Sequence, residues 1–381
     1  MRQLPLRVLQ YGMSASEDAG GVETYLINQF RAMPQTIAQY DFISRNGCHL
    51  MAFEEEISAA GAKIYKVTSR HENARRHYME LLLLFWRIRG RYDVLVVNAS
   101  TLTYGSLILL AWIVRIPIRV YHSHACSDNH QQTIAYRLKC CLDRWVLKHL
   151  ATHRFACSDV AGKWMFGSDM KFEVIPNAIV TKKFLFSNKS RAGLRAQLGI
   201  KDNFVIGMIG NIDPQKNHRF ALSLLSAVRK KINNVKLMIV GGAPNSDGLG
   251  LLDQIRQLVK DLGLEENVLL LGRRDDVQDC LAAMDLFLMP SITEGFGIAA
   301  VEAQLSGLPC LLSTGVPSDV KITTNVKFLS TENDIASWAD CICKMKCKRK
   351  CAEATLYKTT KYSIENSIDT MKQIYVSFAE I

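Results

Sequence analysis

The stretch PSITEGFGIAAVEA, residues 290–303, is the most informative part of the chain. An apolar run at 284–289 precedes it and predicts a buried strand. A short polar segment and a Gly-Phe-Gly turn follow, so a helix is expected to begin near Ile298. The start of a helix presents unpaired backbone N–H groups and the positive end of the helix dipole, which together suit a phosphate group. The stretch therefore predicts a strand, a polar turn and a helix that can receive an anion.

Two carboxylates, Glu294 and Glu302, lie in this stretch, and the residues between them are glycine or apolar. Taken alone, the spacing fits an ordinary loop acid at Glu294 and an ordinary helix-surface acid at Glu302 as well as it fits a functional site. The flanking residues favour another interpretation. Val301 and Ala303 beside Glu302, and the segment 307–312 further on, are typical of a buried helix that leads into another buried strand. A buried carboxylate needs a polar partner, and sugar hydroxyls are suitable partners.

The pattern Pro-Ser-x-x-Glu-Gly-Phe-Gly, with a second Glu eight residues after the first and Gly-x-Pro at 307–309, resembles the donor-site signature of the retaining glycosyltransferase family 4. The resemblance implies an α/β fold of the GT-B class, with two Rossmann-like doubly wound domains facing across a cleft. It also implies a hexosyltransferase that uses a nucleotide sugar, similar to the glycosyltransferases of bacterial surface polysaccharides. Any acceptor it implies is a glycan or a lipid-linked oligosaccharide.

Composition and charge fit this class of protein without selecting it. The 381 residues are 48% hydrophobic and 22% charged, which is ordinary for a globular chain of two or three domains. The formal net charge of +11 favours anionic partners such as nucleotide phosphates or anionic lipids. No secretory signal is recognised, so a cytoplasmic protein whose eleven cysteines are free thiols is expected. The cysteine cluster at 341–351 lacks Cys-x2-Cys spacing, which makes a zinc site there the lesser alternative.

Apolar runs alternate with helical segments along the chain, which predicts parallel, doubly wound sheets. An N-terminal acceptor-side domain is expected at 1–180 and a nucleotide-sugar-binding domain at 203–360, with a link at 181–202 between them. The resemblance implies that a last helix, within 361–381, packs back on the N-terminal domain.

Two apolar segments end in arginines, at 81–91 and at 107–119. Both are shorter than a membrane-spanning helix requires. They fit core helices of an α/β domain, or alternatively a basic and apolar patch that rests on the inner face of an anionic membrane.

Residues that follow predicted strands of the second domain are candidates for binding the donor. Lys216 would add a point charge to backbone donors around a diphosphate, although an ordinary solvated lysine is the alternative. The family has Gly-Arg-x4-Lys-Asn at this point, and Asn211 stands where the arginine is usual. This departure removes one cation from the phosphate site. Arg273 or Arg274 could replace it, and Arg273 follows a strand whose end contacts the nucleobase in the family.

The first domain offers two further groups of candidates. Gly20 and Gly21 form a turn between the first strand and the first helix, and the corresponding turn faces the donor in the family. His122, Ser123 and His124 end a later strand. The resemblance implies that His124 points at the donor sugar and its phosphate, with His122 and Ser123 on the acceptor side. The alternative is a polar strand end that has no role in the reaction.

The resemblance implies a reaction in which His124, Lys216 and Glu294 act at the reacting centre. Glu294 holds hydroxyls of the donor sugar, Glu302 holds the ribose, and Lys216 stabilises the leaving diphosphate together with backbone groups of Gly295, Phe296, Gly297 and Ile298. No Asp-x-Asp occurs in the chain, so neither a metal nor another cofactor is expected.

Two other functions are compatible with parts of this pattern. A nucleotide-sugar 2-epimerase shares the fold, but it would need catalytic acids in the first domain, where few candidates exist. A non-catalytic basic protein that binds a nucleotide or a membrane would need no donor site. Nucleic acid is not an expected partner, because the chain lacks a nucleic-acid-binding motif and its aromatic residues are not interleaved with basic ones.

Overall fold

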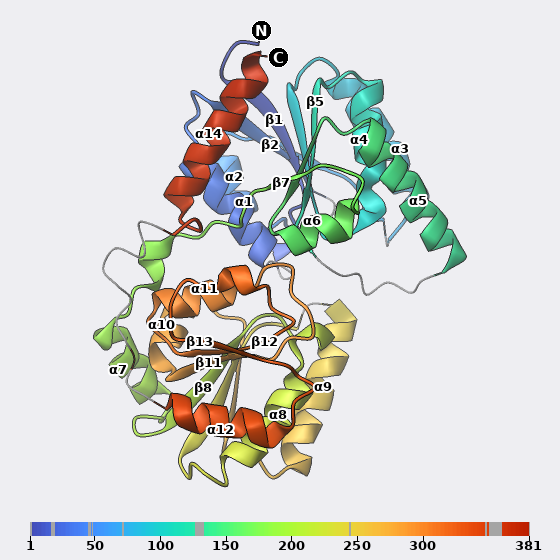
Figure 1. Ribbon diagram of the computed structural model, residues 1–381. Helices are drawn as coiled ribbons and strands as arrows, with labels where there is room; N and C mark the ends of the chain where they lie inside the picture. Colours follow the sequence, from blue (N-terminus) through green and yellow to red (C-terminus); the bar gives the residue numbers. More distant parts are fainter. Residues whose placement is uncertain are drawn as a thin grey trace. The chain divides into compact units, whose positions relative to one another are not determined.

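The computed structural model describes residues 2–16, 20–44, 47, 49–70, 72–125, 133–243, 245–346, 349 and 360–380. The chain forms two compact units. The first comprises Met1–Ile179 and Lys361–Ile381, and the second comprises Val180–Thr360. Each unit is an α/β layer structure in which helices cover both faces of one parallel sheet (Figure 1). This confirms the predicted fold class.

The sheet of the first unit has the strand order β3-β2-β1-β4-β5-β6-β7 within the described residues, and every neighbouring pair is parallel. β4 is buried along its whole length, because helices cover both faces of the sheet. The elements of this unit are β1 Leu6–Tyr11, α1 Gly21–Ala32, β2 Ala38–Ser44, α2 Glu54–Ala59, β3 Ile64–Lys66, α3 Ala74–Ile88, β4 Val94–Ala99, η2 Leu102–Tyr104, α4 Gly105–Ile113, β5 Ile118–Ser123, α5 Ile134–His149, β6 His153–Ala156, α6 Asp159–Phe166, β7 Glu173–Val174 and α14 Ile364–Glu380.

The sheet of the second unit has the order β10-β9-β8-β11-β12-β13 in the part of the chain that is described, again with parallel neighbours. Its elements are η3 Thr181–Phe184, α7 Asn188–Gln197, β8 Phe204–Ile209, η4 Pro214–Lys216, α8 His218–Val228, β9 Val235–Val240, α9 Asn245–Asp261, β10 Val268–Gly272, α10 Val277–Ala283, β11 Leu286–Met289, α11 Ile298–Leu305, β12 Cys310–Ser313, η5 Ser318–Val320, β13 Val326–Leu329 and α12 Ile335–Met345. β11 and α11 lie where the stretch 290–303 predicts a strand before it and a helix at its end.

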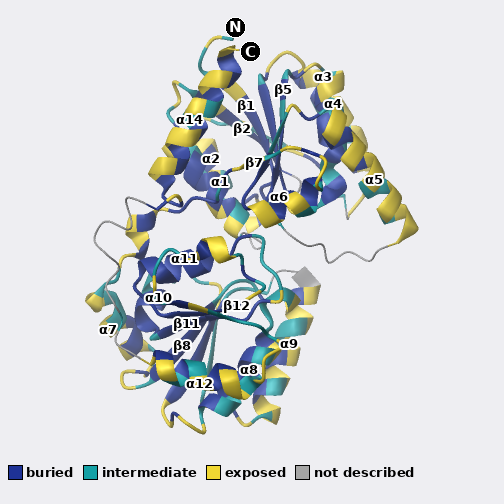
Figure 2. Ribbon diagram, in the orientation of Figure 1, coloured by how far each residue is buried: buried dark blue, intermediate teal, exposed yellow. Residues whose placement is uncertain are grey.

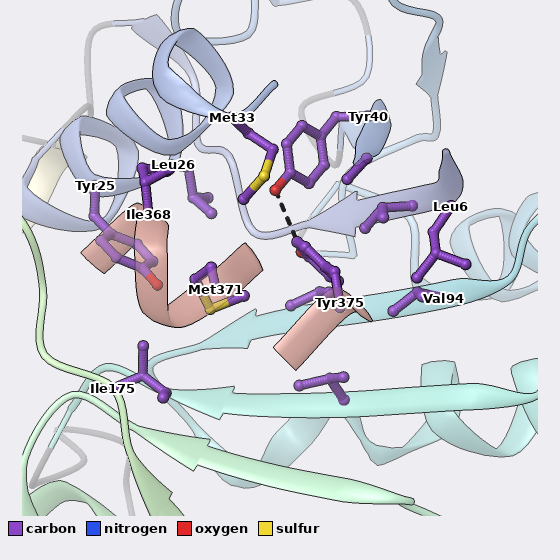
Figure 3. Close-up of a cluster of buried hydrophobic side chains, with 14 of the residues drawn as sticks. Leu6, Tyr25, Leu26, Met33, Tyr40, Val94, Ile175, Ile368, Met371 and Tyr375 are labelled. Atoms are coloured by element: carbon purple, nitrogen blue, oxygen red, sulfur yellow. Dashed lines mark hydrogen bonds between the residues drawn. The ribbon is translucent and has the colours of Figure 1, made fainter. Parts of the chain in front are cut away.

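The C-terminal helix α14 belongs to the core of the first unit. Ile368, Met371 and Tyr375 on its inner face are buried with side chains of α1 and of the sheet (Figure 3). The hydroxyl of Tyr40 donates a hydrogen bond of 3.3 Å to the hydroxyl of Tyr375. Two segments more than 300 residues apart in the chain therefore share one core, and the first unit cannot be completed without α14.

The segment expected as a link, 181–202, is folded as part of the second unit. Arg191 and Arg195 on α7 both bind the carboxylate of Asp285, with nitrogen–oxygen distances of 2.5 and 3.1 Å. The same carboxylate accepts a hydrogen bond from the backbone of Val205 in β8. One acid thus ties α7 to the amino ends of two central strands.

Candidate donor-binding site

The order of the second sheet places its switch point between β8 and β11, the two central strands whose following connections run in opposite directions. Ligands of doubly wound proteins bind beyond the carboxyl ends of such strands. The segment after β8 carries Lys216 and the segment after β11 carries Glu294. Topology alone therefore brings together two residues that are 78 positions apart in the sequence.

Lys216 and Glu294 form an ion pair in which Nζ lies 2.6 Å from Oε1. The same oxygen accepts a hydrogen bond of 2.7 Å from the hydroxyl of Ser291. Both charged side chains are largely removed from solvent. Each charge is therefore satisfied by the other in this structure, and a ligand with phosphate and hydroxyl groups could take over both partners.

The turn that carries Glu294 is held against the loop that follows β12. The backbone N–H of Glu294 donates to the carbonyl of Gly315 at 3.0 Å, and the hydroxyl of Ser313 donates to the carbonyl of Ser291 at 2.5 Å. A Cβ at Gly315 would lie 2.2 Å from the carbonyl oxygen of Ile292. Only glycine allows so close an approach of the two segments, and the approach fixes the carboxylate in place.

The strand ends beneath Lys216 also meet through glycines. Gly210 has a φ of +146°, and a Cβ at Gly241 would lie 1.8 Å from the carbonyl oxygen of Gly210. Both glycines are hydrogen-bonded to neighbouring strands: the backbone N–H of Gly210 donates to the carbonyl of Val240, and that of Gly241 donates to the carbonyl of Gly272. The turn after β8 can therefore lie this close to the end of β9 only while both positions remain glycine.

We expect Gly241→Ala to destabilise the second unit by roughly 1–3 kcal/mol, because neither backbone segment can move away from the added methyl group. Thermal unfolding followed by circular dichroism measures the effect. Gly250→Ala is the matched control, since a Cβ there meets nothing within 4 Å and alanine is the better residue in the middle of α9. Equal unfolding midpoints for wild type and Gly241→Ala would show that the close contact does not constrain the turn.

α11 begins beside this turn. Gly297 precedes the helix with a φ of +87°, a left-handed conformation that disfavours residues with a side chain. Phe296 is buried and anchors the Gly-Phe-Gly turn. The first N–H groups of α11, from Ile298 onward, thus start at the same segment as Glu294, which is the arrangement predicted for an anion site.

Glu302 lies on α11, whose residues 299–305 are all buried. Burial raises the pKa of its carboxyl to about 7, and the ammonium of Lys183 on η3 opposes that rise. A buried carboxyl without a compensating cation in contact destabilises its own charged form. Hydroxyl groups that donate hydrogen bonds to Glu302 would therefore stabilise its carboxylate form.

The other predicted donor residues of this unit lie near the strand ends. Asn211 follows β8 directly and is half-buried, while Arg273 is exposed just after β10. Arg274, the alternative to Arg273, is paired with Asp276 through two hydrogen bonds of 2.6 and 2.8 Å. The ion pair raises the pKa of Arg274 and lowers the pKa of Asp276. The role of either arginine in donor binding stays a prediction.

The glycine turn of the first unit is organised by Glu23, which the sequence did not single out as a site residue. Its carboxylate accepts hydrogen bonds from the backbone of Gly20 at 2.8 Å and of Ser14 at 3.2 Å. Gly20 caps α1, which begins at Gly21. An acid three residues after a helix cap is the sequence signal for this arrangement.

His124 lies at the carboxyl end of β5, as predicted, and both of its ring nitrogens are engaged. Nε2 lies 3.2 Å from the amide oxygen of Asn98, whose nitrogen donates to Gln10 and to the carbonyl of Tyr11. Burial lowers the pKa of His124 to about 4, so the neutral ring donates from Nε2. Nδ1 lies 3.1 Å from the amide oxygen of Asn177. With Nε2 as the donor, the Asn177 amide rotated by 180° would turn its nitrogen to Nδ1 and donate to it.

His122 and Ser123, predicted on the acceptor side, are both buried. The ring of His122 packs against Tyr25 and His124, and its Nε2 has no partner among the described residues. Burial, with a smaller contribution from His124, lowers the pKa of His122 well below its ordinary value. The hydroxyl of Ser123 donates to the carbonyl of Ala161 at 3.2 Å. The roles assigned to Gly20, Gly21, His122, Ser123 and His124 stay predictions.

Of the cysteine cluster, Cys341 and Cys343 lie on α12 as free thiols, while Cys347 and Cys351 lie outside the described residues. No helix in the described part of the chain is both long and apolar enough to cross a membrane.

The fold and the second unit's switch-point site together define a two-unit α/β protein of the GT-B class. Residues 190–361 match the family model "Glycosyl transferases group 1". The chain therefore carries a group 1 glycosyl transferase domain and is a glycosyltransferase.

Comparisons over the whole chain agree with this assignment. EpsF of Bacillus subtilis (strain 168) is 28% identical over 93% of each chain. The UDP-Gal:alpha-D-GlcNAc-diphosphoundecaprenol alpha-1,3-galactosyltransferase of Escherichia coli is 23% identical, also over 93% of each chain. The crystal structure of HepE from Anabaena, in complex with UDP and glucose, has a TM-score of 0.80 at 19% identity and covers 98% of this chain and 100% of its own. These likenesses confirm the GT-B fold.

Proposed function

We propose that this enzyme transfers a glycosyl group from a nucleotide sugar to a hydroxyl of a glycan or lipid-linked oligosaccharide, with retention of the anomeric configuration. The product would belong to a bacterial surface polysaccharide such as a capsule, an exopolysaccharide or an O-antigen. The observation that carries the proposal is the convergence of Lys216 and Glu294 at the switch point where α11 begins. The bound UDP and glucose of HepE, and the lipid diphosphate acceptor in the name of the Escherichia coli relative, support it.

Donor binding exchanges the partners of the ion pair. The diphosphate of the donor takes the ammonium of Lys216, and hydroxyls of the donor sugar take the carboxylate of Glu294. In the reaction, the bond between the anomeric carbon and the phosphate oxygen breaks while the acceptor oxygen bonds to that carbon. The acceptor proton passes to the leaving diphosphate. Lys216 and the backbone N–H groups of 295–298 stabilise the negative charge that develops there.

The remaining donor contacts follow from the same geometry. Glu302 accepts hydrogen bonds from the ribose hydroxyls, which favours its carboxylate form. Arg273 contacts the nucleobase or supplies the cation that Asn211 does not. The reaction proceeds without a metal in this proposal, since the chain has no Asp-x-Asp and Lys216 with the helix amides neutralises the diphosphate instead.

A panel of UDP-, GDP- and ADP-sugars tests the proposal by thermal stabilisation of the full chain. We expect one base to raise the unfolding midpoint, and EDTA to leave that shift and the subsequent transfer unchanged. NMR of the product should show the anomeric configuration of the donor. Inversion at that carbon, or a requirement for added Mn²⁺, would contradict the proposal. Conversion of the donor to its 2-epimer with no acceptor present would identify an epimerase instead.

The proposed acceptor also determines where the enzyme works. A lipid-linked oligosaccharide is presented at a membrane surface, so we propose peripheral contact with the cytoplasmic face through the basic and apolar segments 81–91 and 107–119. The chain's net charge of +11 favours this contact.

A further inference from the structure

The first unit exposes large hydrophobic side chains on three helices, α3, α4 and α5. Within the described residues, all but three of the large hydrophobic side chains that are at least half exposed lie on these helices. The exceptions are Leu50, Leu249 and Ile292. Isolated exposed hydrophobic residues are normal, but ten on neighbouring helices are not, and such a concentration indicates an interaction surface.

α5 has two apolar faces. Its inner face buries Val146 and Leu147, while its outer face exposes residues spaced four, four and three positions apart. This spacing forms one continuous stripe along the helix. A helix that only covers the sheet would carry polar residues on that face. The stripe consists of Ile134, Leu138, Leu142 and Trp145.

α3 and α4 extend the exposed apolar surface. α3 buries Leu81, Phe85 and Ile88 on one face and exposes apolar side chains on its other face. α4 contacts both α3 and α5, so the three helices are neighbours (Figure 2). The exposed residues of α3 and α4 are Met79, Leu82, Leu83, Trp86, Trp112 and Ile113. The apolar run 81–86 is therefore a core segment on one side of its helix and an exposed segment on the other.

α4 and α5 pack closely against each other. Asp143 of α5 is buried and pairs with Lys139 at 2.8 Å. A Cβ at Gly105, the first residue of α4, would lie 2.6 Å from the carboxylate of Asp143. Glycine at this position lets the start of α4 lie directly on the acid, which an N-terminus with its positive dipole favours. The exposed stripe therefore belongs to a helix that packs directly on the start of α4.

The charges around these residues are almost all positive. Only two acids lie on the three helices, and both are paired: Asp143 with Lys139, and Glu80 with Arg76. Trp86 also lies beneath a guanidinium, with Cζ of Arg89 4.6 Å from its ring centroid. The exposed basic residues on or directly after the three helices are Arg75, Arg76, Arg87, Arg89, Arg91, Arg115, Arg137, Arg144 and Lys148.

We propose that the outer face of α3, α4 and α5 is an anchor that lies in the interface of an anionic lipid bilayer, with α5 as its main inserted element. Tryptophan and leucine at the surface, surrounded by arginine, match the boundary between acyl chains and acidic headgroups. Two copies of the chain that met through this face would bring like positive charges together, and this repulsion disfavours a dimer. The biological meaning of the anchor rests on the proposed function, but lipid binding is measured independently of transfer.

Three of the chain's five tryptophans, Trp86, Trp112 and Trp145, are exposed in this face, so intrinsic fluorescence reports on it directly. The full chain is mixed with vesicles of phosphatidylcholine alone or with 30% phosphatidylglycerol. We expect co-sedimentation, a blue shift of tryptophan emission and quenching by brominated lipid with the anionic vesicles only. Leu138→Glu/Leu142→Glu should weaken binding at least tenfold. Arg75→Gln/Arg137→Gln should weaken it about fivefold for each charge removed.

Leu249→Glu is the matched control, since it places the same charge on a similarly exposed leucine of α9 in the second unit. It should bind vesicles as the wild type does. All variants should keep the thermal stabilisation by the nucleotide sugar, which separates loss of the anchor from loss of the fold or of donor binding. Equal binding to both kinds of vesicle, no binding to either, or self-association that Leu138→Glu/Leu142→Glu abolishes would each overturn the inference.

Discussion

Lys216→Met should lower the rate of glycosyl transfer by about 10²–10³-fold, because it removes the cation that offsets charge developing on the leaving diphosphate. Methionine keeps the length and most of the volume of the side chain, so packing around η4 is preserved. The rate is measured as release of nucleoside diphosphate from the nucleotide sugar that stabilises the protein, either by transfer or by slow hydrolysis. Hydrolysis allows the measurement before the acceptor is known.

The ion pair of Lys216 with Glu294 requires a control, because the substitution leaves a largely buried carboxylate without its cation. Lys231→Met is the matched variant, since Lys231 also pairs with an acid, Asp340, but at the exposed surface of the second unit. It should be fully active. The double variant Lys216→Met/Glu294→Gln removes the unpaired charge. If the pair only supports the fold, the double variant regains activity. If Lys216 and Glu294 act on the donor, it stays inactive, and the loss then cannot be attributed to an unpaired buried charge.

The sequence predicted the central strands of the second unit well, because β8, β11 and β12 are almost entirely apolar and β9 is interrupted only by Lys236, as is typical of a sheet covered on both faces. It did not predict β13, in which only Val326 is buried and a lysine follows directly. An edge strand with one partly exposed face lacks both the apolar run and a clear alternation, so its sequence carries little signal.

The sequence also predicted only part of the candidate site. Glu294 and Glu302 were found from one linear stretch, and Lys216 from a second. The contacts that position them were not found, because they join residues far apart in the chain. The hydroxyl of Ser291, which the sequence did not single out, binds the carboxylate of Glu294, and Asn98 determines which nitrogen of His124 carries the proton. Local spacing identifies groups capable of chemistry, whereas orientation depends on tertiary contacts.

The exposed stripe of α5 shows a further limit of local patterns. Its sequence alternates apolar and charged residues at helical spacing, as a helix covering a sheet should. Only the structure shows that the buried face is the one with Val146 and Leu147 and that Leu138 and Leu142 point outward. A helix with apolar residues on two sides cannot be oriented from its sequence alone.

Donor affinity should fall about tenfold between pH 8 and pH 6, because Glu302 must be ionised to accept the ribose hydroxyls and burial raises its pKa to about 7. The buried histidines do not titrate in this interval, because burial lowers the pKa of His124 and of His218 to about 4 and the pKa of His122 well below its ordinary value. Isothermal titration with an intact nucleotide sugar measures the effect, since its diphosphate has no proton to lose in this interval. Binding should also release a proton to the buffer near pH 6.5.

Glu302→Gln keeps the shape of the side chain and removes the titration. Its affinity should be low, at or below the wild-type value at pH 6, and independent of pH. The unliganded protein gives a second readout with the opposite sign. The folded state holds a proton on Glu302 that the unfolded chain releases above its ordinary pKa of 4.5, so wild-type stability should decline between pH 4.5 and 7 as this group ionises. Glu302→Gln should lack that part of the decline and be the more stable protein at pH 8. A variant that instead retained the wild-type pH dependence of donor affinity would show that Glu302 does not contact the ribose, and would shift that role to another group of the second unit.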